Sequence, residues 1–261
     1  MIDFLTGRSE IELSYFREKT FDMFITSPPY DNLRDYDGYH FSFEGVAEEL
    51  YRILKEGGIG VWVVNDQYIN GSRSLTSFKQ ALYFQELGFR IHDVMIYEKN
   101  GASFPSTNRY YQVYEFMFIL SKGKPKTTNL LKDRPNKWAG STNFGTPTKR
   151  KKDGTLIKKE KYIVPDYGIR YNIWKINGGY GYSAENDIAY NHPAIFPLSL
   201  AEDHIKSWSN ENDLILDPMC GSGTTAIACA KLNRSAVCID MNPSYIKLAK
   251  ERYEEFINDV D

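Results

Sequence analysis

The run Thr26-Ser27-Pro28-Pro29-Tyr30 constrains the fold more than any other part of the chain. It follows an apolar segment, 21–25, that predicts a buried β-strand. Two consecutive prolines remove two amide donors and fix φ twice, so the strand must end there in a rigid turn. The turn keeps acceptors, the Ser27 hydroxyl and the local carbonyls, beside an aromatic ring. Such an arrangement suits a planar substrate with an exocyclic amino group, although an ordinary strand-ending turn also explains it.

Strand-like and helix-like segments alternate over the first 120 residues. Apolar stripes predict a helix over 43–55, ended by Gly57-Gly58, and another over 77–87. We expect strands over 21–26, 59–64, 91–97 and 113–120. After residue 191 we expect helices over 197–208, 226–232 and 243–256, and strands over 214–216 and 236–239. This order predicts an α/β protein with a doubly wound, mostly parallel sheet.

The segment 121–190 breaks the alternation and is rich in Gly, Asn, Pro, Thr and Lys. From Lys122 to Lys175 it has fifteen Lys or Arg against four Asp or Glu, a net of +11 in a chain of formal net charge −2. The run Lys149-Arg150-Lys151-Lys152 lies within it, among tyrosines and tryptophans. A charge run is usually a solvated loop, but this asymmetry fits a surface that follows nucleic-acid phosphates. We therefore expect three parts, 1–120, a basic insert over 121–190, and 191–261.

A second motif, Asp217-Pro218-Met219-Cys220-Gly221-Ser222-Gly223-Thr224-Thr225, joins a predicted strand to a predicted helix. Glycines there allow a tight turn and a close approach to a ligand, and the helix N-terminus offers N–H groups. Asp240 ends the next predicted strand, where a carboxylate can accept both ribose hydroxyls. The glycine pattern also fits a dinucleotide, but Asp217 would repel a pyrophosphate and suits a cationic amino-acid tail. The motif therefore favours S-adenosylmethionine and methyl transfer over a nicotinamide-dependent oxidoreductase.

The remaining residue types argue against other kinds of site. Cys220, Cys229 and Cys238 form no CxxC pair, and the four histidines lack the spacing of metal ligands, so we expect neither a disulfide framework nor a metal. No apolar run approaches the roughly 18 residues of a membrane-spanning helix. We expect a cytoplasmic protein without a signal peptide.

Together the two motifs resemble those of the amino-group DNA methyltransferases. In that family a (Ser/Asn/Asp)-Pro-Pro-(Tyr/Phe) turn works with an Asp-Pro-x-x-Gly-Ser-Gly-Thr loop. The order here, with the turn first, a basic insert next and the glycine loop last, resembles the β group. The segment His192–Leu198 resembles the family's cofactor-flanking motif. Phe4-Leu5-Thr6-Gly7 resembles its N-terminal strand, followed by Arg8 where the family often has an acid.

What the resemblance implies can be stated residue by residue. It implies the S-adenosylmethionine-dependent methyltransferase fold in permuted order, with a target-recognition insert. The catalytic residues would be Ser27, Pro28, Pro29 and Tyr30. The cofactor-binding residues would be Thr26, Phe196, Pro197, Asp217, Pro218, Cys220, Gly221, Ser222, Gly223, Thr224, Thr225 and Asp240. Independently of the resemblance, the charge run and a position just before a predicted strand predict Lys149, Arg150, Lys151, Lys152 and Arg109 as DNA-binding residues.

The resemblance also implies the chemistry. Tyr30 would stack on a base that has left the duplex, while acceptors at Ser27 and the Pro28 carbonyl hold its amine in position. Ser-Pro-Pro is associated in this family with cytosine N4, and Asp- or Asn-Pro-Pro-Tyr with adenine N6. No metal is required. Carbon-5 methylation is disfavoured because none of the cysteines follows a proline.

We therefore expect a site-specific methyltransferase acting on double-stranded DNA within a restriction–modification system, at cytosine N4, with adenine N6 as the alternative. Methylation of RNA or of a protein glutamine, and a catalytically silent DNA-binding protein on this scaffold, are further alternatives. A homodimer and a restriction endonuclease partner stay open. Smaller expectations concern four other residues. Asp31 and Asn32 could line the base pocket, Asp66 could touch a ligand or cap a helix, and Tyr110 could contact the DNA backbone.

Overall fold

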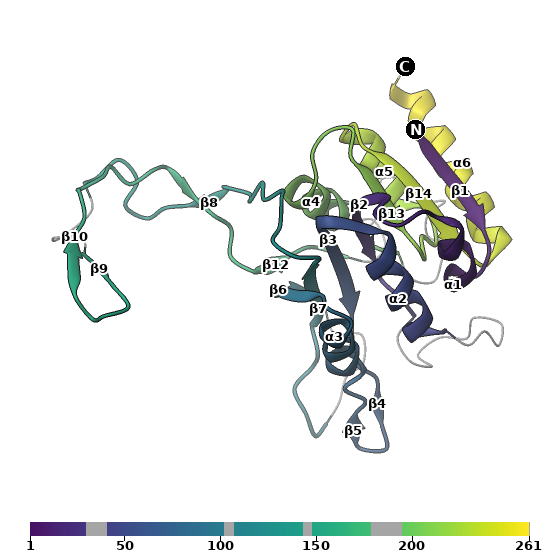
Figure 1. Ribbon diagram of the computed structural model, residues 1–261, viewed down its shortest axis with the longest axis horizontal. Helices are drawn as coiled ribbons and strands as arrows, with labels where there is room; N and C mark the ends of the chain where they lie inside the picture. The colour runs from purple at the N-terminus through teal and green to yellow at the C-terminus, as the bar shows by residue number, and fades with distance from the viewer. Residues whose placement is uncertain (30–40, 102–106, 143–147, 179–194, 261) are drawn as a thin grey trace. The chain divides into compact units, whose positions relative to one another are not determined.

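A computed structural model describes all residues except 30–40, 102–106, 143–147, 179–194 and 261 (Figure 1). The chain forms two compact units. Unit 1 comprises Met1–Asn129 and Asn172–Asp261, and unit 2 comprises Leu130–Tyr171. No described helix combines the length and the apolar content that a membrane crossing requires.

Unit 1 is built on an eight-stranded sheet. The strands, in spatial order, are β1 (Ile2–Thr6), β14 (Ser235–Asp240), β13 (Leu214–Asp217), β2 (Phe21–Thr26), β3 (Leu54–Val64), β7 (Tyr114–Ser121), β6 (Arg90–Glu98) and β12 (Ile173–Lys175). Only the pairs that β7 makes, with β3 and β6, are antiparallel. The mostly parallel sheet confirms the predicted fold class, because parallel neighbours need the crossover connections that the sequence supplies.

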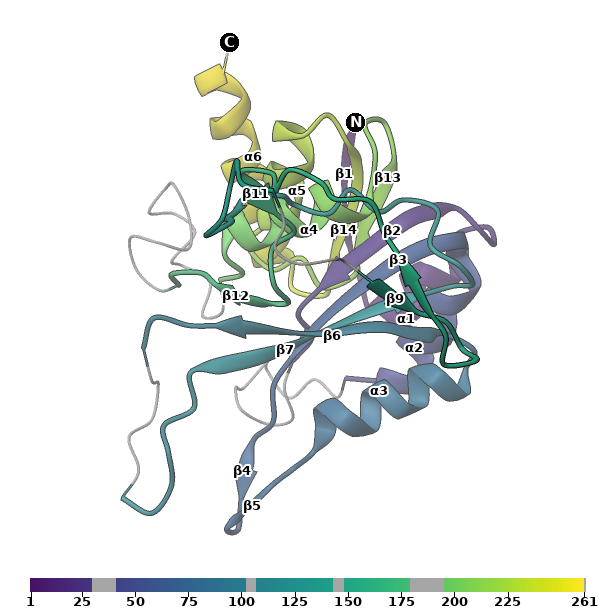
Figure 2. The same cartoon turned by 90° about the vertical axis from the view of Figure 1, so that its left-hand side faces the viewer.

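Helices cover both faces of this sheet. They are α1 (Ser9–Glu12), α2 (Phe43–Ile53), α3 (Thr76–Glu86), α4 (Leu198–Trp208), α5 (Thr224–Lys231) and α6 (Pro243–Val260), with a 3₁₀ turn, η1, at Leu13–Tyr15. Buried residues of α2 and α3 form one core with alternate strand residues, among them Phe24, Trp62 and Leu216. This period of two is what a sheet covered on both faces requires. Figure 2 shows α3 and α4 on opposite sides of the sheet.

The centre of the sheet depends on one glycine. Phe24 of β2 lies in register with Gly60 of β3. A Cβ built on Gly60 would come 2.0 Å from the Phe24 ring. The ring therefore occupies the space that a side chain at position 60 would need, and any larger residue there would force the two central strands apart.

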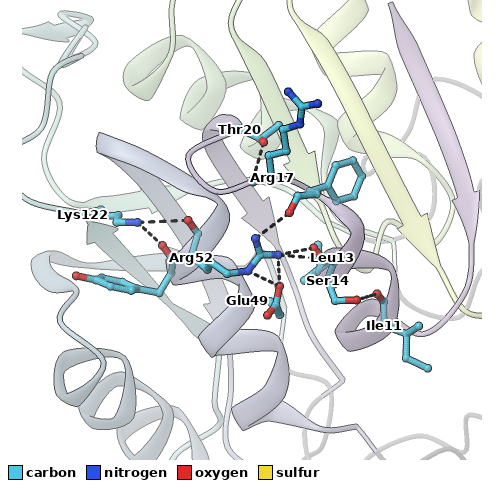
Figure 3. A network of polar contacts seen from close by, with 10 residues as sticks. Ile11, Leu13, Ser14, Arg17, Thr20, Glu49, Arg52 and Lys122 are labelled. Carbon is cyan, nitrogen blue, oxygen red and sulfur yellow. Dashed lines mark hydrogen bonds and ion pairs between the residues drawn. The ribbon is translucent and has the colours of Figure 1, made fainter.

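Two cations, the half-buried Arg52 and the buried Lys122, and not a glycine, mark the end of α2 (Figure 3). Arg52 donates to the carbonyls of Phe16, at 2.8 Å, and Leu13, at 3.0 Å. Lys122 donates to the carbonyls of Tyr51 and Leu54, which a helix C-terminus leaves without intrahelical partners. Burial lowers the pKa of Lys122. The prediction that Gly57-Gly58 ends this helix is wrong, because both glycines lie inside β3.

Unit 2 contains two short antiparallel strand pairs, and most of their residues are exposed. β9 (Thr148–Arg150) pairs with β10 (Leu156–Lys158), and β8 (Arg134–Pro135) pairs with β11 (Tyr167–Gly168), both antiparallel. Its cations lie over aromatic rings: Arg134 Cζ is 4.6 Å from the Tyr171 centroid. This unit is shorter than the expected insert over 121–190, because β12 joins the main sheet beside β6.

Candidate active site

The two motifs singled out in the sequence lie at the same edge of the sheet. β13 and β2 are parallel neighbours, with Ile215 opposite Met23 and Leu216 opposite Phe24. Asp217 therefore ends β13 beside the residues that end β2, just before the Ser27-Pro28-Pro29 turn. Stretches separated by about 190 residues thus meet where the carboxyl ends of parallel strands collect ligands in open α/β sheets.

The proline turn begins as soon as β2 ends, at Thr26. Pro28 is buried, whereas Ser27 and Pro29 are half-buried. Since neither proline has an N–H to donate, the ladder cannot continue, as predicted. Tyr30, Asp31 and Asn32 lie outside the described residues, so the stacking role expected of Tyr30 stays a prediction.

The glycine loop is tightly fixed against the neighbouring elements. Gly221 and Gly223 adopt positive φ angles of 49° and 79°, the region in which only glycine is unstrained. A Cβ on Gly223 would come 2.7 Å from the Cβ of Ala249 in α6. The Gly221 amide donates to Asp240 Oδ2 at 2.9 Å. These contacts fix the shape of the loop, and Gly223 leads directly into α5.

Asp217 is buried, and both its carboxylate oxygens hold the loop. Oδ1 accepts the Met219 amide at 3.1 Å and Oδ2 accepts the Thr225 hydroxyl at 2.5 Å. Burial raises its pKa to about 6, while these two donors lower it. Thr26 Oγ1 also faces the carboxylate and lowers its pKa, but without the geometry of a hydrogen bond. Asp217 thus brings a titratable negative charge to the mouth of the loop.

Asp240 ends β14 and is half-buried. Its Oδ1 accepts the Asn242 amide at 2.9 Å, and its Oδ2 accepts Gly221. Burial raises its pKa, and these two amides oppose that rise. Each carboxylate oxygen keeps a further lone pair. The carboxylate therefore retains acceptor capacity, and its predicted role towards ribose hydroxyls stays a prediction.

Two hydroxyls beside the loop lack a hydrogen-bond partner among the described residues. They are Thr26 Oγ1, at the end of β2, and Thr224 Oγ1, in the first turn of α5. Nearly all buried polar atoms in native proteins are hydrogen-bonded. Their position at the edge shared by the two motifs fits a polar ligand that would supply the missing partners.

The segment before α4 also reaches this edge. α4 precedes β13, and β13 runs towards the carboxyl edge, so the start of α4 lies at that edge. Pro197 is buried and its carbonyl accepts the Leu200 and Ala201 amides at 3.1 Å. Phe196 is half-buried. The preceding residues 192–194 of the predicted cofactor-flanking motif lie outside the described residues.

Two residues that support the loop were missed in the sequence. Arg252 of α6 is 1% exposed and donates to the hydroxyl, at 3.0 Å, and the carbonyl of Ser222. Ser9 of α1 donates to the Pro218 carbonyl at 2.5 Å. The available signal for Arg252 was its position four residues after Leu248, where an arginine continues the apolar stripe of the helix.

The cysteines are free thiols buried around the loop. A hydrogen bond with Cys238 and burial raise the pKa of Cys220, and burial raises that of Cys229. Buried, protonated thiols behave as small apolar side chains. Cys220 therefore packs within the loop, as the sequence suggested, and its contact with cofactor stays a prediction.

Of the remaining predicted residues, Asp66 and Arg109 lie in unit 1, and the Lys149–Lys152 run lies in unit 2. Asp66 is buried and accepts the Ser77 amide, at 2.9 Å, and hydroxyl, at 3.0 Å, so it caps α3. Arg109 lies between β6 and β7 and stacks on Tyr68. The run Lys149–Lys152 is fully exposed on β9 and the turn after it, in unit 2.

Comparison with known proteins identifies the family. The model of the DNA methylase family, N6_N4_Mtase, matches residues 21–251. The chain belongs to the N6/N4 DNA methylase family. It is accordingly a DNA methyltransferase of the amino-group type, as the resemblance implied.

Individual relatives agree with this assignment. The orphan methyltransferase M.BamHII of Bacillus amyloliquefaciens is 53% identical over 239 residues, covering 91% of this chain and 90% of its own. The type II methyltransferase M.HpaI of Haemophilus parainfluenzae is 30% identical over 262 residues, which cover 95% and 73%.

Two solved structures share the fold. The PvuII DNA methyltransferase (cytosine-N4-specific) superposes with a TM-score of 0.70 at 19% identity, covering 99% of this chain and 92% of its own. A DNA modification methylase of Thermus thermophilus, complexed with S-adenosyl-L-methionine, gives 0.65 at 23% identity, covering 98% and 96%. The permuted methyltransferase fold is thus confirmed.

Proposed function

We propose that this methyltransferase transfers a methyl group from S-adenosylmethionine to N4 of cytosine in double-stranded DNA. The observation that carries the proposal is the Ser27-Pro28-Pro29 turn at the end of β2, beside the Asp217 loop. The fold is common to enzymes of different target base, so the choice of cytosine rests on Ser27. Adenine N6 is the alternative.

The residues of the edge fit the cofactor. Its ammonium and sulfonium groups suit the buried Asp217 carboxylate, and its ribose hydroxyls suit the remaining lone pairs of Asp240. The two buried hydroxyls, Thr26 and Thr224, offer polar contacts that the described residues leave unused. When bound, S-adenosylmethionine supplies an electrophilic methyl group. Asp217 and Asp240 would hold it while Gly221 and Gly223 let the backbone come close.

The turn has the acceptors that a target amine requires. An exocyclic amine is a poor nucleophile because its lone pair is delocalised into the ring. The Ser27 hydroxyl and the Pro28 carbonyl would accept its N–H groups, favour a pyramidal nitrogen and orient it. As the nitrogen lone pair forms the bond to the methyl carbon, the methyl–sulfur bond of the cofactor would break, its electron pair would stay on sulfur, and the methylated amine would release one proton to solvent. A serine hydroxyl is a weaker acceptor than a carboxylate. Ser27 would therefore act mainly by orienting and positioning the target amine.

Unit 2 supplies the charge for a duplex. It holds eleven Lys or Arg against four Asp or Glu, a net of +7, and its hairpins are exposed. Cations with interleaved aromatic rings fit a phosphate backbone. Lys149, Arg150, Lys151 and Lys152 are the residues proposed to contact it. A homodimer and an endonuclease partner remain expectations of the sequence.

A labelling experiment tests the proposal. The full chain is incubated with methyl-labelled S-adenosylmethionine and mixed-sequence duplex DNA from methylation-free cells, and the DNA is digested to nucleosides. Label in N4-methylcytosine is expected. Label in N6-methyladenine would reassign the base. Preference for RNA or a glutamine-containing protein would reassign the substrate, and label in 5-methylcytosine, or none, would overturn the proposal.

A serine pair isolates the role of the turn. Ser27→Ala is expected to lower turnover by roughly 10²-fold, because one positioned polar group is lost. Ser14→Ala is the matched control, since this exposed hydroxyl donates to the Ile11 carbonyl at 2.7 Å within the same unit. Equal activity of the two variants would remove Ser27 from the mechanism. DNA bound equally well by inactive wild-type protein and by Ser27→Ala would indicate a silent scaffold.

A further inference from the structure

A small β-hairpin starts at the same edge of the sheet as the proline turn. β3 ends at Val64, beside β2, and leads through Asn65 and Asp66 into β4 (Tyr68–Ile69) and β5 (Ser72–Arg73). β6 is parallel to β3 in the sheet, so the connection from β6 to β7 begins at this edge too. Figure 1 shows the hairpin and this connection extending from the sheet on the same side. Both therefore start at the edge of the sheet where β2 leads into the proposed catalytic turn.

The hairpin and the connection meet in one stack, which we call the arginine–tyrosine cluster: Tyr68, Arg73 and Arg109. Arg109 Cζ lies 3.8 Å from the Tyr68 ring centroid, and Arg73 Cζ lies 5.7 Å from it. Tyr68 is 39% exposed, so the ring carries a cation while still meeting solvent. Such stacking fixes the plane of a guanidinium and leaves its edge N–H groups for other acceptors.

The cluster is anchored to the sheet by polar side chains. Arg73 Nη1 donates to the Asp66 carbonyl at 3.2 Å and to Gln112 Oε1. Gln112 in turn donates to Asn65 Oδ1 at 2.5 Å, and Asn65 donates to the Tyr114 carbonyl at 3.1 Å. The hairpin and the connection are thus tied to the ends of β3 and β7. Arg73 is therefore placed before any partner arrives.

The cluster carries two positive charges, on Arg73 and Arg109. Across the described parts of the chain, no carboxylate forms an ion pair with Arg73 or Arg109. The nearest candidate in sequence, Asp66, is turned to Ser77 of α3. Two adjacent cations without a carboxylate fit an anionic partner. Tyr110, the residue after Arg109, is 99% exposed.

We propose that the arginine–tyrosine cluster binds phosphates of duplex DNA beside the target base, as a contact separate from unit 2. The inference rests on the proposed function, because it takes the substrate to be DNA. Moving a base out of the stack requires its own strand to be held. Cations carried by segments that start at the same edge as the catalytic turn would hold that strand, whereas the basic run lies in unit 2. The cluster therefore positions the target strand.

Salt dependence of DNA binding tests this directly and needs no turnover. Arg109→Ala is expected to reduce the log–log slope of affinity against salt by roughly one unit, the effect of one lost phosphate contact. Arg109→Lys should keep most of the slope. Tyr68→Ala should lower affinity by several fold, because Arg109 loses its support. Lys79→Ala is the matched control, an exposed cation on the neighbouring α3, and should retain the wild-type slope.

A second readout separates positioning from simple attraction. A duplex with 2-aminopurine beside the target base reports unstacking by its fluorescence. Arg109→Ala and Tyr68→Ala should give a weaker signal than wild type at saturating protein, with cofactor affinity unchanged. Wild-type slope and fluorescence in both variants would overturn the inference while leaving methylation by the parent intact. A parent that binds no duplex DNA would overturn both the inference and the proposed function.

Discussion

The carboxyl edge of the sheet and the hairpins of unit 2 differ in what fixes them. At the edge, hydrogen bonds with β14, α6 and α1 hold the Asp217 loop, and outside unit 2 the chain has a net charge of −9. Unit 2 has a net charge of +7 and is held by ladders of two or three residues. A site for chemistry needs fixed groups, whereas a basic surface needs charge and exposure.

Mutations in one region should therefore affect its own function and leave that of the other region intact. Changes in unit 2 should weaken DNA binding and leave cofactor binding intact. Changes beneath the glycine loop should do the reverse.

Removing the basic run should have the largest effect. Replacing Lys149, Arg150, Lys151 and Lys152 with alanine is expected to lower DNA affinity on the order of 10³-fold at roughly 0.15 M salt if all four contact phosphates. The salt slope should fall by about four units at most. Lys247→Ala with Lys250→Ala, two exposed cations of α6, is the control. Fluorescence anisotropy across a salt series measures both. An unchanged slope would mean that the run does not touch DNA.

Arg252 tests the support of the glycine loop. Arg252→Met leaves the buried Ser222 carbonyl and hydroxyl without this donor, so we expect a loss of about 3 kcal/mol in the free energy of unfolding. Cofactor affinity should fall with it, because the loop loses its fixed shape. Lys247→Met, on the exposed side of the same helix, should change neither. Urea unfolding and calorimetry are the measurements. Weaker DNA binding with an undisturbed cofactor site would contradict the separation.

Tyr30 tests the target side of the edge, although its structure is not described. Tyr30→Ala is expected to lower turnover by roughly 10- to 100-fold, the worth of one base–aromatic stack. Cofactor affinity should stay close to that of wild type. Tyr30→Phe keeps the ring and should retain most of the activity. Single-turnover kinetics measures the methyl-transfer rate, and calorimetry measures cofactor affinity. A loss confined to cofactor binding would contradict the assigned role.

Local patterns predicted the strands and the two motifs well. β2 was predicted at its observed bounds, and β7 and β13 to within a residue, because a sheet covered on both faces requires buried apolar runs. The Ser27 turn and the Asp217 loop were found because their residues are contiguous. That they meet at one edge follows from parallel topology, once the strand order is fixed.

What the sequence concealed depends on contacts between distant residues. Lys122 reaches the end of α2 from 68 residues away, so the glycine pair after the helix was misleading. Ser9 reaches Pro218 across 209 residues, and Arg252 reaches Ser222 from another helix. β12 is only three residues long, and its place beside β6 depends on pairing that no local pattern encodes. Tertiary contacts therefore decided these points.

The smallest effect concerns pH and the charge at the loop. Burial raises the pKa of Asp217 to about 6, and the Asp240 carboxylate contributes in the same direction. A cationic ligand favours the ionised carboxylate, so its binding should lower this pKa and release a proton. Affinity for S-adenosylmethionine should therefore be constant well above pH 6 and fall below it, by at most about tenfold per pH unit.

Calorimetry from about pH 5 to 8 checks this, in two buffers of different ionisation enthalpy to count the released proton. Asp217→Asn is the control: it keeps an acceptor for the loop but carries no charge, so its weaker affinity should lose most of the dependence. The charge of unit 2 should be irrelevant here, and the alanine variant of the Lys149–Lys152 run should show the wild-type profile. A flat profile in wild type would mean that Asp217 holds the loop but does not face a cation. The edge would then bind cofactor through shape and backbone alone.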